Sequence, residues 1–518
     1  MASTQHRNEA RDVGVLVFGR FLAMLAEAIM PFVIVRLLGK ADFGAFTGLL
    51  LIYTTLSVIL TAGFPAAILY FLAGRSDSER MAISKRLFLS VMGLGGIIGV
   101  ILYAIGLYGN DALAVLSEWM SGSSGAGEES VDLSYLTFFA VLPVFDVLAR
   151  IFPNFLIAEN RARSAAVFGV FRALGISTGT VLPAALGLGV EGIIGGMTTF
   201  ALLQAVWVGW VFRSQYRGVA SETCQVSVME MVRFSFPLGL TDIVNNLNAA
   251  IDRYAILLLM SAVAFAEYRA GAWQLPITTI AYSVGHVYMP RFVELIRANE
   301  GMEVIRLWRE SIGKVSLIVI PVCMIFFVGA EEFITLAFTE KYLAAVPVFR
   351  LYVLYTMGRV ASYGVVILAA GESAQILKAS IFTLASNLLL TIPFTIYLGF
   401  IGPAVGTVLA FIPSAAVYCY YISRALHIPW NRTFPLVQWL GIVLLGAVAA
   451  VPAVAIKFWT PVHPAVALFA YAISTLTAFI VLGRLSGQIS GADLQFAADW
   501  LKLKILKNPP TQSSDGAA

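Results

Sequence analysis

Long apolar runs recur along almost the whole chain, and this feature leaves few folds open to it. A helix that crosses the hydrocarbon core of a bilayer needs about 20 predominantly apolar residues. Runs near that length, bounded by charged residues or by glycine and proline, occur about 14 times in the sequence. The sequence therefore predicts an all-α polytopic membrane protein with about 14 transmembrane helices.

The predicted spans form three groups. The first six are 13–35, 43–72, 87–108, 133–157, 165–186 and 193–212. The next six are 231–259, 270–289, 315–337, 346–369, 376–398 and 404–422. An appended pair, 436–456 and 465–482, completes the set. The expected organisation is a cytoplasmic N-terminus at 1–12, an N-lobe of six helices at 13–215, a cytoplasmic linker at 216–230, a C-lobe of six helices at 231–425, two additional helices at 436–484 and a cytoplasmic tail at 485–518.

Composition and motifs argue against several classes of function. Of the 518 residues, 59% are hydrophobic and 12% are charged, whereas a soluble domain carries about 25% charged residues. The apolar stretch 13–35 is longer than a signal-peptide core, so we interpret it as a retained first helix. Basic residues sit at span ends rather than in one patch, which gives no reason to expect a nucleic-acid partner. The three cysteines Cys224, Cys323 and Cys419 match no metal or disulfide spacing.

The one match to the dinucleotide motif GxGxxG consists of Gly187, Gly189 and Gly192. It lies between two apolar spans with no strand before it, so we interpret it as a membrane hairpin. No P-loop, HExxH or CxxC motif occurs. We therefore expect neither an enzyme nor a bound cofactor or metal.

The distribution of basic residues predicts the orientation of the spans. If the N-terminus is cytoplasmic, the inside segments hold most of the lysine and arginine, including the clusters at 75–86, 291–314 and 502–507. The longest outside segment, 109–132, is acidic and contains neither Lys nor Arg. The positive-inside rule thus places both termini in the cytoplasm.

An internal repeat supports an architecture of two related lobes. Five residues recur at one constant offset: Pro183, Leu188, Gly189, Gly192 and Gly196 in the first copy, and Pro393, Leu398, Gly399, Gly402 and Gly406 in the second. Both copies fall between the fifth and sixth span of a six-span set. Transporters are commonly built from two such lobes with the substrate site between them.

Charged residues inside the predicted spans point to an internal polar site. Ten of them are Arg20, Glu27, Asp146, Arg150, Arg172, Asp242, Asp252, Arg253, Arg350 and Arg359. If these ten faced lipid, the cost would be about 30 kcal/mol at about 3 kcal/mol each. We therefore expect them to face a cavity, and the excess of arginines over acids predicts that this cavity is cationic.

Some of these charges have a partner on the same predicted helix. Arg20 and Glu27 lie two helical turns apart on one face, and Asp146 and Arg150 are four residues apart. Each of these pairs either lines the cavity or neutralises itself. The seventh span carries a polar stripe of Asp242, Asn246 and Arg253, which are candidates for cavity lining or ion coupling together with Glu27, Asp146 and Asp252.

Asp252 and Asn248 lie off the polar stripe of the seventh span, so we expect them to pair with a neighbouring helix or cap a break. Pro237, one turn before Asp242, is expected to kink the span and free carbonyl groups there. A cation site near Asp242 is one consequence of that arrangement.

Arg172 and Arg359 have no acid nearby on their own helices. A guanidinium group suits phosphate because its planar fork donates two parallel hydrogen bonds and stays charged. The sequence thus predicts a phosphate-bearing substrate, with Arg20, Arg150, Arg172 and Arg359 as candidate diphosphate contacts. Arg350, near the outer end of its span, is expected to snorkel.

The chain resembles the Wzx-like polysaccharide flippases of the multidrug/oligosaccharidyl-lipid/polysaccharide exporter superfamily. VRLLGKADFGAFTGLL at 35–50 is similar to the first outside turn of that family, and TAGFPAAILYFLAG is similar to its second span. RFSFPLGL and NAAIDRYAILLL resemble the seventh span, which places Asp252 and Arg253 at the common Asp-Arg position. FAEYRAGAWQL resembles the start of the eighth span, although Ala266 stands where the family usually has glycine.

This resemblance implies a MATE/flippase-like fold and the flipping of an undecaprenyl-diphosphate-linked oligosaccharide across the bacterial inner membrane by alternating access. The product would feed O-antigen or exopolysaccharide biosynthesis. It also implies coupling to a proton or sodium gradient, and a polysaccharide polymerase and chain-length proteins as partners besides the lipid bilayer.

Three other functions remain open at this point. A MATE-type drug or cation antiporter shares the fold, but its cavity should be aromatic and acidic. A lipid II flippase would share the appended pair of helices. An O-antigen polymerase or ligase would need polar chemistry in a sizeable outer loop, and the loop at 109–132 contains neither Arg nor His.

Overall fold

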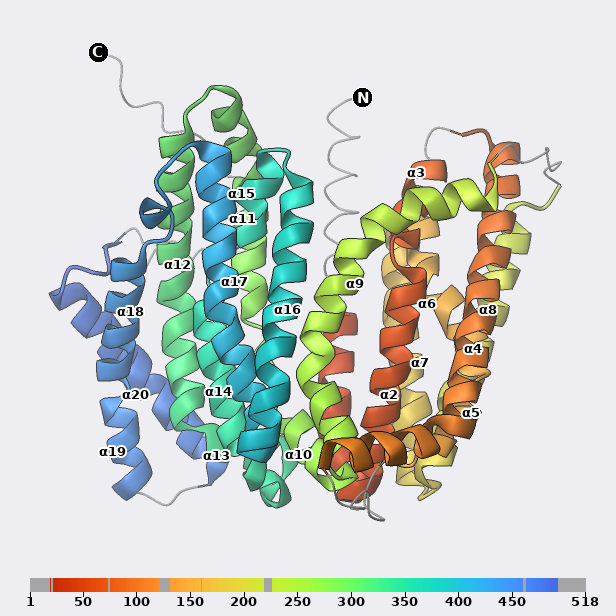
Figure 1. Cartoon of the computed structure of the whole chain (residues 1–518), viewed down its shortest axis with the longest axis horizontal. Helices are drawn as coiled ribbons and strands as arrows, with labels where there is room; N and C mark the ends of the chain where they lie inside the picture. The colour runs from red at the N-terminus through yellow and green to blue at the C-terminus, as the bar shows by residue number, and fades with distance from the viewer. Residues whose placement is uncertain are drawn as a thin grey trace. The chain divides into compact units, whose positions relative to one another are not determined.

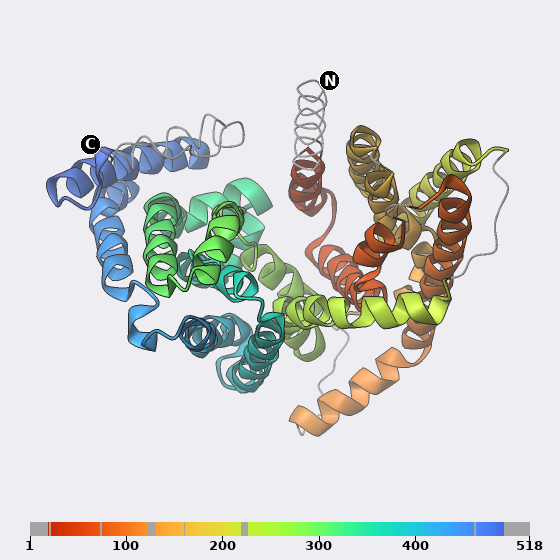
Figure 2. The same ribbon diagram turned by 90° about the horizontal axis from the view of Figure 1, so that it is seen from above.

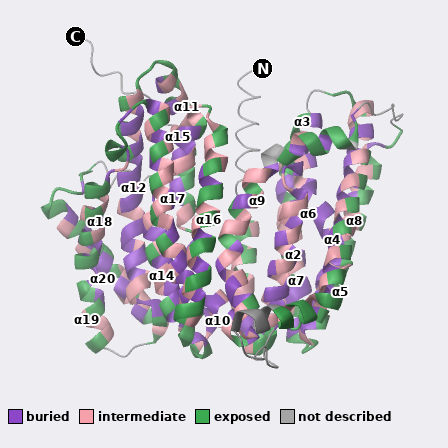
Figure 3. Cartoon of the chain, in the orientation of Figure 1, coloured by how far each residue is buried: buried purple, intermediate pink, exposed green. Residues whose placement is uncertain are grey.

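The computed structural model of the chain describes residues 19, 22–72, 75–121, 131–159, 161–218, 226–459 and 463–491. Every regular element among these residues is a helix, as the apolar runs predict. Exposed positions recur along many of the helices (Figure 3). Many exposed side chains are large and apolar, for example Val437 at 86% exposed and Trp459 at 83% exposed. An apolar exterior of this extent fits lipid rather than water as the surrounding solvent. The chain is a multi-pass membrane protein.

The chain divides into two compact units. Unit 1 comprises Met1–Ala270 and Ser380–Gly406, and unit 2 comprises Gly271–Ala379 and Thr407–Ala518. These units do not follow the expected lobe limits of 13–215 and 231–425, because α9 and α10 cluster with the preceding helices. The division into two six-helix lobes stays a prediction.

Within unit 1, residues 22–37 are helical. Further helical elements follow, and Figure 1 labels the α-helices among them. In chain order these are α2 Lys40–Thr61, α3 Phe64–Leu72, α4 Asp77–Ser121, η1 Leu133–Tyr135, α5 Leu136–Phe139, α6 Leu142–Ala158, α7 Ala162–Ala185, α8 Gly189–Gln215, α9 Val228–Leu259 and α10 Ala262–Gly271, which ends at the unit boundary. At 45 residues, α4 exceeds the length of one bilayer crossing. Figure 2 shows its C-terminal end, drawn in orange, leaving the rest of the unit.

Unit 2 begins with α11 and ends with the appended helices. Its elements are α11 Thr278–Arg297, α12 Gly301–Val328, α13 Ala330–Phe338, η2 Glu340–Ala345, α14 Val346–Gly358, α15 Tyr363–Ala369, η4 Trp430–Arg432, α18 Leu436–Ala449, α19 Val451–Trp459 and α20 Pro464–Leu485. Three elements are shared with or belong to unit 1: α16 Ser373–Leu398, η3 Gly399–Ile401 and α17 Gly402–Leu426.

The helices confirm the predicted fold class, while the number of spans stays a prediction. By length and composition, nine helices of the described chain qualify as spans, or up to ten if the bent pair of η1–α5 and α6 counts as one span. That number treats α16 and α17 as a single run of 54 residues, although each helix alone is long enough to cross a bilayer. All predicted spans from residue 43 onward nevertheless overlap helix.

Several predicted spans are broken helices. The span expected at 43–72 is interrupted between α2 and α3, where Gly63 has a φ of +78°. A Cβ at this glycine would lie 2.0 Å from the carbonyl oxygen of Ser235 on α9, so both the backbone angle and the close approach require glycine. Another break separates α14 from α15 and places Arg359 at the C-cap of α14. By contrast, α9 is continuous through Pro237 and curves along its length (Figure 1).

The two copies of the sequence repeat form similar helical hairpins. The first copy joins α7 to α8, and the second joins α16 to α17 through η3. Gly189 and Gly399, which correspond in the repeat, both have positive φ, at +65° and +59°. Pro183 and Pro393 both lie inside the first helix of their hairpin. The match of local conformation agrees with a duplicated hairpin.

Within unit 1, the start of α2 packs closely on α10. A Cβ added to Gly44 would lie 1.9 Å from the carbonyl oxygen of Ala262 and 3.3 Å from the Cβ of Ala266. Lys40 and Glu267 form an ion pair beside this contact. Ala266, the position where the family usually has glycine, is thus a fully buried residue in this packing.

In unit 2, the appended helices are attached along α12 and α13. Tyr471 of α20 and Ala453 of α19 share a buried apolar cluster with Ile325 of α12. Lys457 of α19 forms ion pairs with two acids in the first turn of α13, Glu331 at 3.1 Å and Glu332 at 3.3 Å. Glu331 and Glu332 therefore help to hold the appended pair of helices.

Candidate functional site

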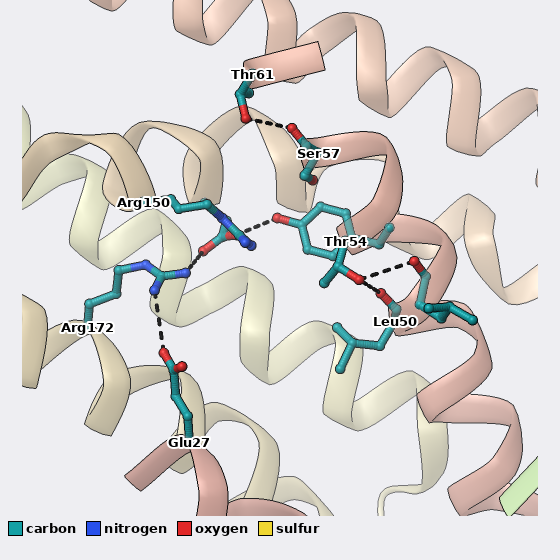
Figure 4. A network of polar contacts seen from close by, with 10 residues as sticks. Glu27, Leu50, Thr54, Ser57, Thr61, Arg150 and Arg172 are labelled. Atoms are coloured by element: carbon teal, nitrogen blue, oxygen red, sulfur yellow. Dashed lines mark hydrogen bonds and ion pairs between the residues drawn. The ribbon is translucent and has the colours of Figure 1, made fainter. Parts of the chain in front are cut away.

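Polar residues from four helices of unit 1 meet around one buried carboxylate. We define the Asp146 cluster as Glu27 of helix 22–37, Tyr53 of α2, Asp146 and Arg150 of α6, and Arg172 of α7. Figure 4 shows the side chains of Arg150 and Arg172 converging, with Glu27 on the far side of Arg172. Arg172 and Tyr53 lie near the middle of their helices, so the cluster sits at mid-depth of both.

The local structure around α6 explains the position of Asp146. The segment η1–α5 and the helix α6 meet at a bend of 62°, and Pro143 occupies the first turn of α6, where the missing proline N–H costs no helical bond. Asp146 follows in the next turn and faces the interior of the unit. Arg150, four residues later, lies on the same helical face.

The carboxylate of Asp146 is fully engaged. Its side chain is 5% exposed. One oxygen accepts hydrogen bonds from the Tyr53 hydroxyl and from Arg150 at 2.8 Å, and the other accepts from Arg172 at 3.2 Å. The guanidinium of Arg150 also lies 6.0 Å from the centroid of the Tyr53 ring, within the range of a cation–π contact. A buried charge requires such partners in this environment.

Arg172 joins the cluster to the first helix. Its guanidinium is 15% exposed and lies 3.8 Å from a carboxylate oxygen of Glu27, whose side chain is 56% exposed. The backbone carbonyl of Arg172 accepts a hydrogen bond of 3.3 Å from Gln204, a fully buried residue of α8. This bond from Gln204 therefore ties α8 to α7 at the level of Arg172.

The cluster corrects one expectation about charge pairing. Arg172 has no acid on its own helix, but other helices supply Asp146 and Glu27, so its charge is balanced. The expected pair of Asp146 and Arg150 is present. The expected pairing of Glu27 with Arg20 stays a prediction, because Arg20 lies outside the described residues. Among the described residues of this cluster two arginines meet two acids, so the predicted cationic excess is absent from them.

Sequence reasoning missed Tyr53 and Gln204. A single tyrosine in an apolar helix is usually a packing or interfacial residue, so Tyr53 carried no signal by itself. Gln204 is a polar residue in the apolar stretch of α8. Its lack of any neighbouring polar residue on the same face was the one available signal that it bonds to another helix.

The polar residues of α9 have a different environment. Asp242 is exposed and Asn246 is half-buried. Arg253 donates to the carbonyl of Ala249 on its own helix, at 2.7 Å. Their predicted roles in lining a cavity or in ion coupling, and the cation site near Asp242, stay predictions.

Asp252 and Asn248 bond to neighbouring helices, as their position off the polar stripe predicts. Asp252 is 3% exposed and accepts a hydrogen bond from Tyr268 of α10 at 3.2 Å. The side-chain oxygen of Asn248 accepts from Asn387 of α16 at 3.1 Å. These bonds hold both residues against neighbouring helices of unit 1, and the predicted role of Asp252 in ion coupling stays a prediction.

Arg359 belongs to unit 2. The helix break after α14 leaves its side chain exposed, 5.4 Å from the ring centroid of Tyr355 and 3.4 Å from the amide oxygen of Gln274. No ion pair involves Arg359 among the residues that the structure describes. Arg350, in contrast, forms an ion pair of 3.1 Å with Glu331. The role of Arg359 as a phosphate contact stays a prediction.

The described residues include no group of three or more His, Cys, Asp or Glu side chains placed to hold a metal ion. His463 instead caps α20, since its Nδ1 accepts from the Ala465 N–H at 3.3 Å. Cys323 and Cys419 are buried free thiols, and Cys224 lies outside the described residues.

Comparison with known proteins gives one family match. The model of the family described as "Polysaccharide biosynthesis protein" matches residues 10–296, more than half of the 518 residues. No curated protein sequence matches the chain significantly.

Solved structures are similar to the chain over most of its length. A lipid II flippase MurJ in an inward closed conformation has a TM-score of 0.67 at 15% identity, covering 91% of this chain and 98% of that protein. An inward-facing multidrug resistance MATE family transporter of the MOP superfamily has a TM-score of 0.51 at 18% identity, covering 80% and 96%. The Vibrio cholerae MATE transporter VcmN has a TM-score of 0.50 at 13% identity, covering 82% and 98%. These similarities show a MurJ- and MATE-like fold.

Proposed function

The chain belongs to the polysaccharide biosynthesis protein family, and from that premise we propose that it flips an undecaprenyl-diphosphate-linked oligosaccharide across the bacterial inner membrane. The movement runs from the cytoplasmic to the periplasmic leaflet by alternating access, and the product serves O-antigen or exopolysaccharide synthesis. The fold supports a transporter rather than a polymerase or ligase, because the similar structures are a flippase and multidrug transporters.

The meeting of Arg150 and Arg172 at mid-depth of unit 1 is the observation that carries this proposal. Two guanidinium groups held side by side offer the paired, permanently charged donors that a diphosphate needs. Ionisable residues at such a depth are expensive, and in membrane proteins they usually mark the path of a substrate or ion. The diphosphate is the chemical group common to all substrates of this lipid-linked class.

Orientation and coupling complete the proposal. With both termini in the cytoplasm, the basic ends of the helices face the inner leaflet, as the positive-inside rule requires. We propose coupling to a proton or sodium gradient, with Asp242, Asn246, Asp252 and Arg253 of α9 as the candidate coupling residues. A polysaccharide polymerase and chain-length proteins are the proposed partners.

Substitution of the arginines tests the proposal. Arg172→Ala removes charge-assisted hydrogen bonds worth about 1.5–3 kcal/mol, so transport should fall by about tenfold to a hundredfold. Arg172→Lys keeps the charge but loses the planar fork, so its defect should be smaller. Arg359→Ala should also impair transport. The measurement is the accumulation of lipid-linked oligosaccharide on the cytoplasmic side of membrane vesicles.

The control is Arg291→Ala, because Arg291 is an exposed residue of α11 that pairs with nearby Glu294, at 2.9 Å. Transport by this variant should equal that of the wild type. If Arg172→Ala and Arg359→Ala both transported normally at wild-type protein levels, the proposed diphosphate contacts would be wrong.

Lipid II flipping is a second candidate function, favoured by the similarity to MurJ over nearly the whole of both chains. Both substrates carry an undecaprenyl diphosphate, so the Asp146 cluster suits either. Proteoliposomes loaded with lipid II or with an undecaprenyl-diphosphate oligosaccharide would separate the two. Selective flipping of lipid II would replace the first proposal, whereas selective flipping of the oligosaccharide would support it.

A further inference from the structure

The two carboxylates that contact Arg172 differ in burial and in the number of groups that bind them. Asp146 is 5% exposed and accepts from three donors on three helices. Glu27 is 56% exposed, and among the described residues its one ion pair is with Arg172 at 3.8 Å, a distance too long for a hydrogen bond. The carboxylate of Asp146 is thus part of the packed interior of the unit, whereas the carboxylate of Glu27 contacts Arg172 from a largely exposed position.

The difference in burial determines which of the two carboxylates a substrate can displace from Arg172. Removing one partner from a buried, hydrogen-bonded ion pair is strongly destabilising, so Asp146 stays with the arginines. A long pair with a largely exposed carboxylate contributes little. A diphosphate presents several oxygens to one guanidinium and forms shorter, paired hydrogen bonds. Such a group should therefore outcompete Glu27 but not Asp146.

Arg150 and Arg172 also have N–H groups without a hydrogen-bond partner among the described residues. Each guanidinium carries five N–H groups, and the Nε atoms of Arg150 and Arg172 are buried without a hydrogen-bond partner among the described residues. A buried donor without an acceptor is costly, so the site favours a ligand that brings further acceptors. With Glu27 in place the four charges sum to zero, and without it they sum to +1, which favours an anion.

The helix that carries Glu27 is loosely packed around this residue. No residue from 22 to 33 is buried. Among the described residues, close contacts lie before and at the end of this stretch: at Gly19, where a Cβ would lie 2.8 Å from the Cβ of Ala166 on α7, and at the buried pair Ile34 and Val35. The segment around Glu27 can therefore leave α7 without unpacking a core.

We infer that Glu27 is an internal substitute for the phosphate of the substrate. In the empty protein it neutralises Arg172 and keeps helix 22–37 against α7. An arriving diphosphate takes its place on Arg172, and the helix is released. Substrate binding and movement of the first helix are thereby one event. The inference rests on the proposed function, because it assigns Arg172 to the diphosphate.

Binding affinities test this exchange. The probe is farnesyl diphosphate, titrated into the full-length protein in detergent micelles, with inorganic pyrophosphate and farnesol in parallel to separate headgroup from lipid binding. Glu27→Gln removes the competing charge at nearly constant size, so the diphosphate should bind about twofold to fivefold more tightly. Glu27→Ala should behave in the same way, which guards against an effect of the glutamine itself.

Two matched variants complete the binding experiment. Glu294→Gln neutralises an exposed acid of α11 and should leave the affinity unchanged. Arg172→Ala should weaken binding in the wild-type and in the Glu27→Gln background. If the Glu27 variants bound the probe equally or more weakly than the wild type, Glu27 would position Arg172 or do nothing, and the exchange would be wrong. If instead Arg172→Ala left binding unchanged, the proposed function would fail as well.

A distance measurement tests the release of the helix. Spin labels at Leu25→Cys on the first helix and Leu174→Cys on α7, both exposed positions, report their separation in a background whose native cysteines are replaced by alanine. Farnesyl diphosphate should lengthen the distance in otherwise wild-type protein, and Glu27→Gln should show the longer distance without ligand. An unchanged distance in both cases would overturn the coupling.

Discussion

Three helices deliver hydrogen-bond donors to the carboxylate of Asp146: Tyr53 from α2, Arg150 from α6 and Arg172 from α7. The contribution of each donor depends on what its loss leaves behind. Loss of the carboxylate would leave two guanidinium groups beside each other at mid-depth of a membrane protein. Loss of the Tyr53 hydroxyl would leave a carboxylate that is still held by two cations.

We predict that Asp146→Asn lowers stability far more than Tyr53→Phe. An uncompensated buried charge costs about 3–5 kcal/mol, whereas one lost hydrogen bond costs about 1 kcal/mol. Thermal unfolding of the purified protein in detergent would give both values. Asp242→Asn, at an exposed position of α9, is the control and should change the melting temperature little. Similar melting temperatures for Asp146→Asn and Asp242→Asn would show that Asp146 does not organise the cluster.

At the scale of elements, close backbone approach decides how α2 sits on α10. At Gly44 there is no room for a side chain, since the nearest atoms are the backbone carbonyl group of Ala262. Such small-residue contacts replace the hydrophobic effect as the basis of helix packing in lipid. On α4, by contrast, Gly93 faces open space, because a Cβ added to it would meet no atom within 4 Å.

This difference predicts opposite outcomes for one substitution at two glycines. Gly44→Leu must push α2 and α10 apart, because backbone atoms cannot move aside, so the yield of monodisperse protein should fall severalfold. Gly93→Leu should express and purify like the wild type. Fluorescence-detected size-exclusion chromatography of both variants measures the effect. A normal profile for Gly44→Leu would mean that α2 and α10 do not pack in this way.

The attachment of α19 should depend on pH. Glu331 lies beyond the end of the candidate span Gly301–Val328. Partial burial acts to raise the pKa of its carboxylate, but Lys457 and Arg350 outweigh that effect and hold the pKa below its usual value. The contribution of Glu331 is therefore present above the ordinary pKa of a glutamate and is lost as the pH falls through the lowered value.

Hydrogen exchange of the α19 backbone should accelerate as the pH falls from about 5 to about 3, beyond the intrinsic pH dependence of exchange. Lys457→Met removes the partner, so this variant should exchange fast at both values. Peptides from α7, which lies outside this network, provide the internal reference. Equal protection of α19 across this range in the wild type would contradict a stabilising role of the ion pairs.

At the scale of the whole molecule, the exposed apolar side chains and the basic segments between the predicted spans together determine how the chain is expected to lie in a bilayer. The lipid-facing helices present large residues such as Val437 and Trp459 outward. The segment at 291–314 is rich in arginine and in acids that pair along the helix, such as Arg306 with Glu303. Charges at such density belong in water at a membrane surface.

We predict that residue 297 faces the cytoplasm and that residue 112 faces the periplasm. In intact cells, an impermeant maleimide should label Ala112→Cys and spare Arg297→Cys, because only the periplasmic side is accessible. Both positions should react after the cells are opened, which controls for local reactivity. Labelling of Arg297→Cys in intact cells would invert the topology.

The sequence by itself determined the membrane class, the approximate positions of the helices, the duplicated hairpin and the family, which the family match confirms. It also determined the pairing of Asp146 with Arg150, because two residues four apart on a helix share one face. These features depend only on residues that are near in sequence and on the thickness of the bilayer, so they can be predicted without the tertiary structure.

Only the tertiary structure decided the partners of Arg172, the roles of Tyr53 and Gln204, and the helix breaks beside Gly63 and Arg359. Each of these features depends on which helices pack against one another and on how they are aligned along their axes. Periodicity along one helix cannot report that, because the partner lies tens or hundreds of residues away in the sequence. The structure thereby adds a contact between Glu27 and Arg172 on another helix, and the inference about substrate exchange depends on that contact.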